Sequence, residues 1–166
     1  MKLIPYNKFT LETQYTPEEL SRKLESVTTI GTERILYKKA TTPFVGRITD
    51  NGFKLVLSSY NPMTNMYKIN SFSPTIRGTY CETGDVTKIT IKQRLVFPVV
   101  LVASVWTLGV LFFQMMFLMI FLQGEPFSVF MLIPLLMLAF MLILMVPGFW
   151  RDAEKSKEIL LRVLLR

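Results

Sequence analysis

One long apolar block limits what this chain can fold into. Residues 95–150 contain a single charged residue, Glu125, whereas residues 1–94 contain 14 Lys and Arg and 8 Asp and Glu. A membrane-spanning helix needs about 20 apolar residues. Residues 95–122 and residues 127–148 each supply that length, and Gln123-Gly124-Glu125-Pro126 between them is typical of a tight turn. The block therefore predicts a transmembrane helical hairpin.

A pair of buried helices in a soluble protein is the alternative to this hairpin. Such helices have a polar stripe at helical spacing. Inside the first span the clearly polar residues are Ser104, Thr107 and Gln114 only. We expect these three to make packing contacts between membrane helices, since polar side chains in spans commonly bond across helices.

Basic residues predict the orientation of the hairpin. Lys88, Lys92 and Arg94 precede the first span, and bases follow the second span from Arg151 onward, while the turn has none. Cytoplasmic flanks of membrane helices are rich in Lys and Arg. We therefore expect a bacterial inner membrane protein with both termini in the cytoplasm. Its expected interface anchors are Lys92, Arg94, Trp150 and Arg151.

The residue types that are missing exclude several kinds of chemistry. The chain has one cysteine, Cys81, and no histidine. A disulfide within the chain, a zinc site of His and Cys, and a Ser-His-Asp or Cys-His catalytic group are therefore excluded. Met137, Met141 and the other methionines of the spans suggest packing rather than a copper path, because they have no His or Cys beside them. We expect no cofactor and no metal.

The first 94 residues predict a cytoplasmic α+β domain. Residues 4–13 favour a strand, and residues 16–28 favour a helix that Thr16 caps and that Pro17 opens. Asp50-Asn51-Gly52 between two apolar runs is a hairpin signal. Later runs at residues 70–82 and 87–97 complete an expected antiparallel sheet of about five strands with one covering helix.

Residues 149–166 predict a short amphipathic helix of their own after the hairpin. Its apolar stripe comprises Phe149, Ala153, Ser156, Leu160 and Val163. This stripe has two possible positions, in the headgroup region of a membrane or against the sheet. We favour the sheet, because the sheet needs a second cover for its apolar face.

A net charge of +7 is compatible with several anionic partners. Attraction to anionic lipid headgroups is the simplest explanation for a chain that enters a bilayer. We do not expect nucleic acid as a partner, because the sequence has no basic run interleaved with aromatic residues.

An irregular polar stretch offers the best candidate for a ligand or partner surface. Its side chains supply donors, acceptors and aromatic faces beside the expected sheet: Tyr60, Asn61, Asn65, Tyr67, Asn70 and Arg77. An ordinary polar hairpin loop is the favoured alternative. The acids near expected turns, Asp50, Glu82 and Asp85, lack the spacing of an acid–base pair, and no phosphate-binding glycine loop is present, so we expect no enzyme.

Five segments in succession resemble a group of small, uncharacterised bacterial membrane proteins. They are IPYNKFTLET, TPEELSRKLESVT, FVGRITDNGFKL, NSFSPTIRG and TKITIKQRL, followed by two spans and a short charged helix. The resemblance covers nearly the whole chain and implies the architecture, an N-terminal cytoplasmic domain before a two-helix hairpin. It implies no activity and no ligand.

Two functions fit these expectations. The first is a non-enzymatic interaction or assembly subunit, tethered to the membrane as a homo-oligomer or with a membrane-protein partner. The second is a ligand-sensing effector, or an oligomeric pore gated by the cytoplasmic sheet. The spans contain no polar stripe that suits the lining of a pore.

Overall fold

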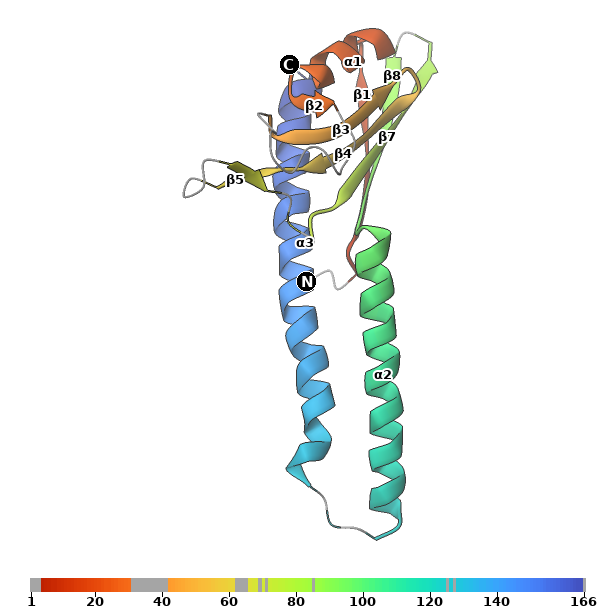
Figure 1. Ribbon diagram of the computed structural model, residues 1–166. Helices are drawn as coiled ribbons and strands as arrows, with labels where there is room; N and C mark the ends of the chain where they lie inside the picture. Colours follow the sequence, from red (N-terminus) through yellow and green to blue (C-terminus); the bar gives the residue numbers. More distant parts are fainter. Residues whose placement is uncertain are drawn as a thin grey trace. The chain divides into compact units, whose positions relative to one another are not determined.

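The computed structural model has an α+β fold with a six-stranded sheet and three helices (Figure 1). It describes residues 4–30, 42–61, 66–68, 70, 72–84, 86–124, 126 and 128–165, with the strands but not the side chains of 59–61 and 66–68. The chain divides into two compact units. Met1–Val96 together with Gly148–Arg166 form one, which we call the sheet domain, and Phe97–Pro147 form the other, the hairpin unit.

The sheet domain begins with a strand and a helix where the sequence predicts them. Strand β1 is Tyr6–Thr13, and helix α1 is Pro17–Glu25. Thr16 and Glu19 form a capping box, in which each side chain accepts a hydrogen bond from the other residue's backbone N–H. Leu20 and Leu24 on one side of α1 are fully buried.

The remaining strands follow the predicted hairpins. Strands β3 (Phe44–Thr49) and β4 (Gly52–Leu57) join at Asn51-Gly52, where Gly52 has a φ of 154°. The last two long strands are β7 (Thr75–Thr83) and β8 (Val86–Arg94). A separate two-stranded hairpin consists of β5 (Ser59–Asn61) and β6 (Met66–Lys68).

The sheet is mixed, which corrects the expected antiparallel sheet of about five strands. Its order is β1-β8-β7-β4-β3-β2, and β2 (Thr28–Ile30) pairs with β3 in parallel. A three-residue strand is too short to show a period of two. The long connection from β2 to β3 gives the chain room for the crossover that parallel pairing requires.

The C-terminal helix also differs from the prediction. The sequence predicts a separate short helix over residues 149–166, but helix α3 runs from Ile133 to Leu165 and passes through Pro147. It is preceded by a 3-10 helix, η2 (Val129–Leu132), so it begins later than the expected span. Pro134 lies in the first turn of α3. The backbone N–H groups there have no partner within the helix, so proline loses no hydrogen bond and does not bend the helix.

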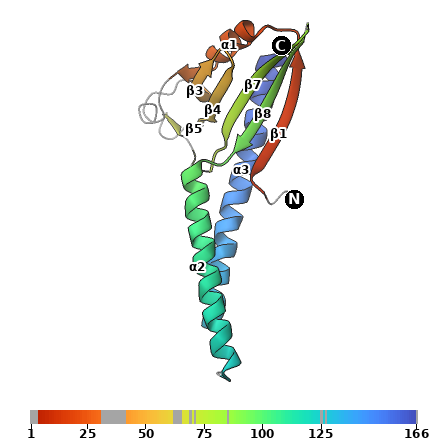
Figure 2. The ribbon, with the colours of Figure 1, turned by 90° about the vertical axis from the view of Figure 1, so that its right-hand side faces the viewer.

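One face of the sheet carries the core of the sheet domain. Inward-facing strand residues such as Leu55, Ile76 and Ile91 pack with Leu20 and Leu24 of α1. Leu160 and Leu164 near the end of α3 join the same cluster. In Figures 1 and 2 the last part of α3 runs beside the sheet. Helices α1 and α3 thus cover the same sheet face, and the C-terminal stripe lies against the sheet.

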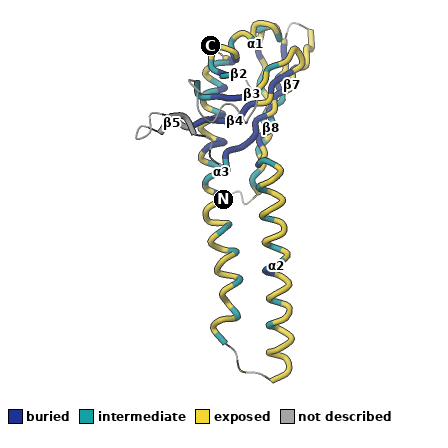
Figure 3. The backbone as a smooth tube through the Cα atoms, viewed as in Figure 1, coloured by how far each residue is buried: buried dark blue, intermediate teal, exposed yellow. Residues whose placement is uncertain are grey.

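The hairpin unit has the opposite pattern of burial. Helix α2 (Phe97–Leu122) and the first part of α3 are exposed along most of their length, as the yellow trace in Figure 3 shows. Val110 is the single buried residue of α2. Both helices are long and apolar enough to span a membrane.

We predict that Leu160→Ala destabilises the sheet domain. The substitution removes a fully buried side chain from the core and leaves a cavity, so the free energy of unfolding should fall by about 2–5 kcal/mol. The matched control is Leu165→Ala at the end of the same helix, where the side chain is half exposed and the change should stay within about 0.5 kcal/mol. Urea unfolding of the purified chain in detergent measures both values, and equal losses would contradict the role of α3 in the core.

Candidate functional site

Within the predicted ligand surface, the structure describes the side chains of Asn70 and Arg77. Asn65 lies outside the described residues. Tyr60 and Tyr67 lie opposite each other on β5 and β6, and Asn61 pairs with Met66, but the positions of their side chains are not described. Asn70 and Arg77 are described, and they serve different parts of the sheet domain.

Asn70 belongs to a polar cluster between the β7 approach and α3. Its Nδ2 donates to Asp152 Oδ2 at 3.4 Å, and its Oδ1 accepts from the N–H of Phe72 at 3.2 Å. The Ser73 hydroxyl donates to the same Asp152 oxygen at 2.5 Å. Asp152 is only 2% exposed, so its carboxylate depends on these donors and on Arg151, whose Nε lies 3.6 Å from Oδ1. Asn70 therefore stabilises the fold here.

A second polar contact joins β8 to α3. Gln93 is fully buried, and its Nε2 donates to Ala153 O at 3.0 Å and to Ser156 Oγ at 2.9 Å. Its Oε1 accepts from Asn7 Nδ2 at 2.8 Å. Ala153 and Ser156 are small, so the backbone of α3 can approach the strand closely. Together with Asp152, Gln93 fixes the axial position of the helix on the sheet, because a shifted helix would leave buried polar groups unpaired.

Sequence reasoning missed this polar junction, which consists of Asn70, Ser73, Gln93, Asp152 and Ser156. One signal was available. Ser156 is a member of the apolar stripe of the C-terminal segment, and Asp152 precedes it by four residues, so the two share one side of a helix. The strand partners gave no such signal, because Ser73 and Gln93 are far away in the sequence.

Arg77 lies on the opposite side of the sheet from the core. It is exposed on β7, directly opposite Lys54 of β4 and Lys92 of β8. The predicted interface anchors lie on β8 and on α3. Arg94 ends β8 and stacks on Tyr6, with its guanidinium carbon 5.5 Å from the ring centroid, and Trp150 meets Phe149 edge to face at 5.4 Å.

An acidic hollow of about 480 Å³ lies beside the start of α1. Its carboxylates are Glu18, Asp50 and Glu82, and Thr16, Pro17 and Ser21 complete the lining. The described part of the chain holds no group of three side chains placed to bind one metal ion. Asp50 and Glu82 thus line the same hollow, which the sequence did not predict. Asp85 lies outside the described residues.

The three polar residues predicted for membrane helix packing are hydrogen-bonded within the hairpin unit. Ser104 donates to Val100 O and Thr107 to Ala103 O, each at 2.8 Å and within α2. Gln114 Nε2 donates across the hairpin to Met131 O at 2.8 Å. Of these three residues, Gln114 therefore links the two apolar segments, while the two hydroxyls bond to their own helix.

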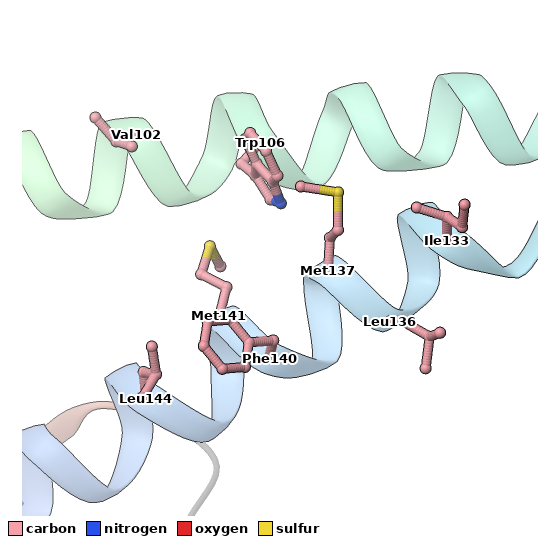
Figure 4. Close-up of a pocket in the computed structure, with 8 residues that line it drawn as sticks. All are labelled: Val102, Trp106, Ile133, Leu136, Met137, Phe140, Met141 and Leu144. Carbon is pink, nitrogen blue, oxygen red and sulfur yellow. The ribbon is translucent and has the colours of Figure 1, made fainter.

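An apolar hollow of about 650 Å³ lies between α2 and α3 inside the hairpin unit (Figure 4). Met137 and Met141 extend from α3 toward Trp106 of α2. All eight lining residues are apolar: Val102, Trp106, Ile133, Leu136, Met137, Phe140, Met141 and Leu144. Thioethers beside an indole are typical of helix packing.

Comparison with known protein families, curated proteins and solved structures finds no match for this chain. The resemblance to small bacterial membrane proteins therefore stays a prediction.

We predict that Ser73→Ala destabilises the sheet domain by about 1–3 kcal/mol, because the buried Asp152 carboxylate loses its shortest donor. Ser26→Ala, which removes an exposed bond to Lys23 O, should cost less than about 0.5 kcal/mol. Adding Asp152→Asn to Ser73→Ala should cost less than the sum of the two single changes. Urea unfolding measures this cycle, and strictly additive losses would show that the two residues are not coupled.

We predict that the sheet domain loses stability at alkaline pH because of Tyr80. Burial raises the pKa of Tyr80 from its usual value near 10 to about 12, and the Ser21 side chain opposes part of this shift. Between these values the unfolded chain loses the phenol proton while the folded chain keeps it, so stability is full below pH 10 and falls toward pH 12. Tyr80→Phe should flatten this slope in thermal unfolding curves between pH 9 and 12. The same slope in both proteins would contradict the prediction.

Proposed function

We propose that this chain is an integral protein of the bacterial inner membrane. In this proposal the hairpin unit anchors the chain and the sheet domain serves as a cytoplasmic interaction or assembly subunit. The observation that carries the proposal is the exposure of two long apolar helices. Within the described chain, only 6% of the most apolar stretch of α2 and 11% of that of the second helix are buried.

Exposure separates these helices from other apolar segments of similar length. A core helix of a water-soluble protein is mostly buried, and a signal sequence lies near the N-terminus. Large side chains such as Leu108, Phe112 and Leu136 are instead more than half exposed. In water such a surface would drive aggregation, whereas in lipid it is solvated.

Helix length supports a span. The 26 residues of α2 extend about 39 Å at 1.5 Å per residue, more than the roughly 30 Å hydrocarbon core of a bilayer. Bases flank the apolar segments at Lys92, Arg94 and Arg151, and no base lies in the described part of the turn. This asymmetry supports cytoplasmic termini.

An anchor fits the hairpin better than a pore. A pore needs polar groups that face water along its length. Ser104, Thr107 and Gln114 are already hydrogen-bonded to carbonyl oxygens of the hairpin unit. We therefore propose that the hairpin holds the sheet domain at the membrane and conducts nothing.

An interaction role fits the sheet domain better than catalysis. The chain contains no histidine, and its one thiol, Cys81, is exposed at the end of β7. The buried polar groups of Gln93 and Asp152 are used to join α3 to the sheet. We propose that the domain binds a partner through its surface and performs no reaction of its own.

We predict opposite labelling of two thiols by a membrane-impermeant maleimide. Cys81 should react in inside-out vesicles and not in spheroplasts, because the sheet domain is cytoplasmic in this proposal. The matched variant carries Cys81→Ser with Gln123→Cys in the hairpin turn, where the side chain is exposed. It should react in spheroplasts only. Labelling of both thiols from the same side would contradict a spanning hairpin.

The mass of the complex released by a mild detergent tests the interaction role. A stoichiometric second protein, or a homo-oligomer without bound small molecules, supports a subunit. A homo-oligomer with a bound anion would favour the ligand-sensing effector instead. A monomer carrying only detergent would contradict the proposed role while leaving the labelling result intact.

A further inference from the structure

Five basic side chains form a line across the outward face of the sheet. Strand pairing places Lys8 opposite Lys92, Lys92 opposite Arg77, Arg77 opposite Lys54, and Lys54 opposite Arg47. The line crosses β1, β8, β7, β4 and β3 in their spatial order. We call these five residues the basic row. Residues directly opposite one another project from the same sheet face, so all five side chains leave the sheet on one side.

The basic row lies on the face opposite the core. Neighbouring residues such as Ile91, Phe53 and Leu55 point the other way and pack under α1 and α3. Four members of the row are exposed, and Lys92 is half-buried. Within the described part of the chain, neither Lys8 nor Arg77 forms an ion pair, and the same holds for Arg47 and Lys92.

The surroundings of the basic row add positive charge and hydroxyl groups. Lys88 and Arg94 face outward on β8, and Glu12 is the single acid among the outward-facing positions of the five strands. Glu12 already pairs with Lys88 at 3.7 Å. One adjoining line consists of threonines, apart from Gly52 on β4: Thr10, Thr90, Thr79 and Thr49.

Cross-strand pairing of like charges in the basic row lowers the stability of the isolated sheet domain. Like charges directly opposite each other on neighbouring strands repel, as Lys92 does with Lys8 on one side and with Arg77 on the other. A register shift would not relieve this arrangement, because the core on the other face fixes the register. A partner that brings negative charge to the row removes the repulsion, and this supplies a physical reason for binding.

From this arrangement we infer that the basic row is the docking site for an acidic segment of a partner protein. The inference rests on the proposed interaction role and names the chemistry of the partner. Strands lie about 4.8 Å apart, so the row is about 19 Å long. A helix presents same-side residues about 5–6 Å apart, close to this spacing, so a helix with Asp and Glu at every third or fourth position offers roughly one carboxylate per cation.

Two other polyanions suit the face less well. Single-stranded nucleic acid binds on aromatic platforms, and the outward positions of these strands contain one aromatic residue, Tyr6, which Arg94 covers. A bilayer surface favours basic residues accompanied by apolar side chains that can insert. Threonines form one line beside the basic row, and the valines of the other line, Val45 and Val56, are buried and cannot insert. An acidic protein segment needs only charge and hydrogen-bond donors, which this face supplies.

Binding of a defined peptide to the full-length chain in an uncharged detergent tests this inference. The probe is a fluorescent alanine-rich helical peptide with Glu at every third or fourth position, and its matched control has Gln at those positions. The Glu peptide should bind with an affinity that falls steeply with salt. The Gln peptide should bind at least tenfold more weakly.

Charge reversal at the centre of the row gives the decisive comparison. Arg77→Glu with Lys92→Glu should weaken Glu-peptide binding at least tenfold. A control with the same change of net charge elsewhere in the sheet domain, Arg22→Glu with Lys155→Glu, should stay within threefold. Thermal unfolding curves of both variants check that the domain remains folded. A peptide with Lys in place of Glu should prefer the row-reversed variant.

Three results would overturn the inference: equal binding by both variants, tighter binding of a 20-base-pair DNA duplex through the same two residues, or tighter binding of vesicles with anionic lipid through them. The detergent-released complex separates this failure from failure of the interaction role. If the complex persists in the row-reversed variant, the partner docks elsewhere and the subunit role stands. If the native chain has no complex at all, the interaction role itself fails.

Discussion

Packing of the end of α3 on the sheet is the contact on which the rest of the sheet domain depends. Leu160 and Leu164 enter the same cluster as Leu20 and Leu24 of α1 and the inward-facing residues of the strands. Without them, part of one apolar sheet face would meet water. The segment that completes this core comes after the hairpin in the sequence, so the domain cannot finish folding until the whole chain is present.

Polar contacts make this packing specific. Apolar side chains alone allow a helix to slide along a sheet, because their contacts are not directional. Gln93 is bonded to Ala153 and Ser156, and Asp152 to Ser73, and all of these residues are buried. A buried amide or carboxylate that loses its partner is costly, so one axial position of α3 is preferred over its neighbours.

The two faces of the sheet have opposite characters, and pairing makes each one continuous. Along β8 apolar Ile89 and Ile91 alternate with Lys88 and Lys92, as a half-buried strand requires. Pairing then aligns the alternations of five strands, so that the inward residues form a core and the outward bases form a line. The register that buries Phe53 and Leu55 necessarily places Lys54 beside Arg77. Core packing and surface charge are therefore set by the same constraint.

The sequence by itself determined the local elements and the apolar hairpin. Thr16 and Pro17 mark the start of α1, Asn51-Gly52 marks a hairpin, and the long apolar runs predict two helices, because each signal depends on neighbours in the chain. It did not determine the parallel strand β2, the unbroken α3, the polar junction or the basic row. The sequence predicted a separate helix from residue 149, whereas α3 continues unbroken from Ile133 to Leu165, and Arg77 and Lys92 gave no sign that they are neighbours. Those features join residues far apart in the sequence, and only the tertiary pairing of strands and the docking of α3 bring them together.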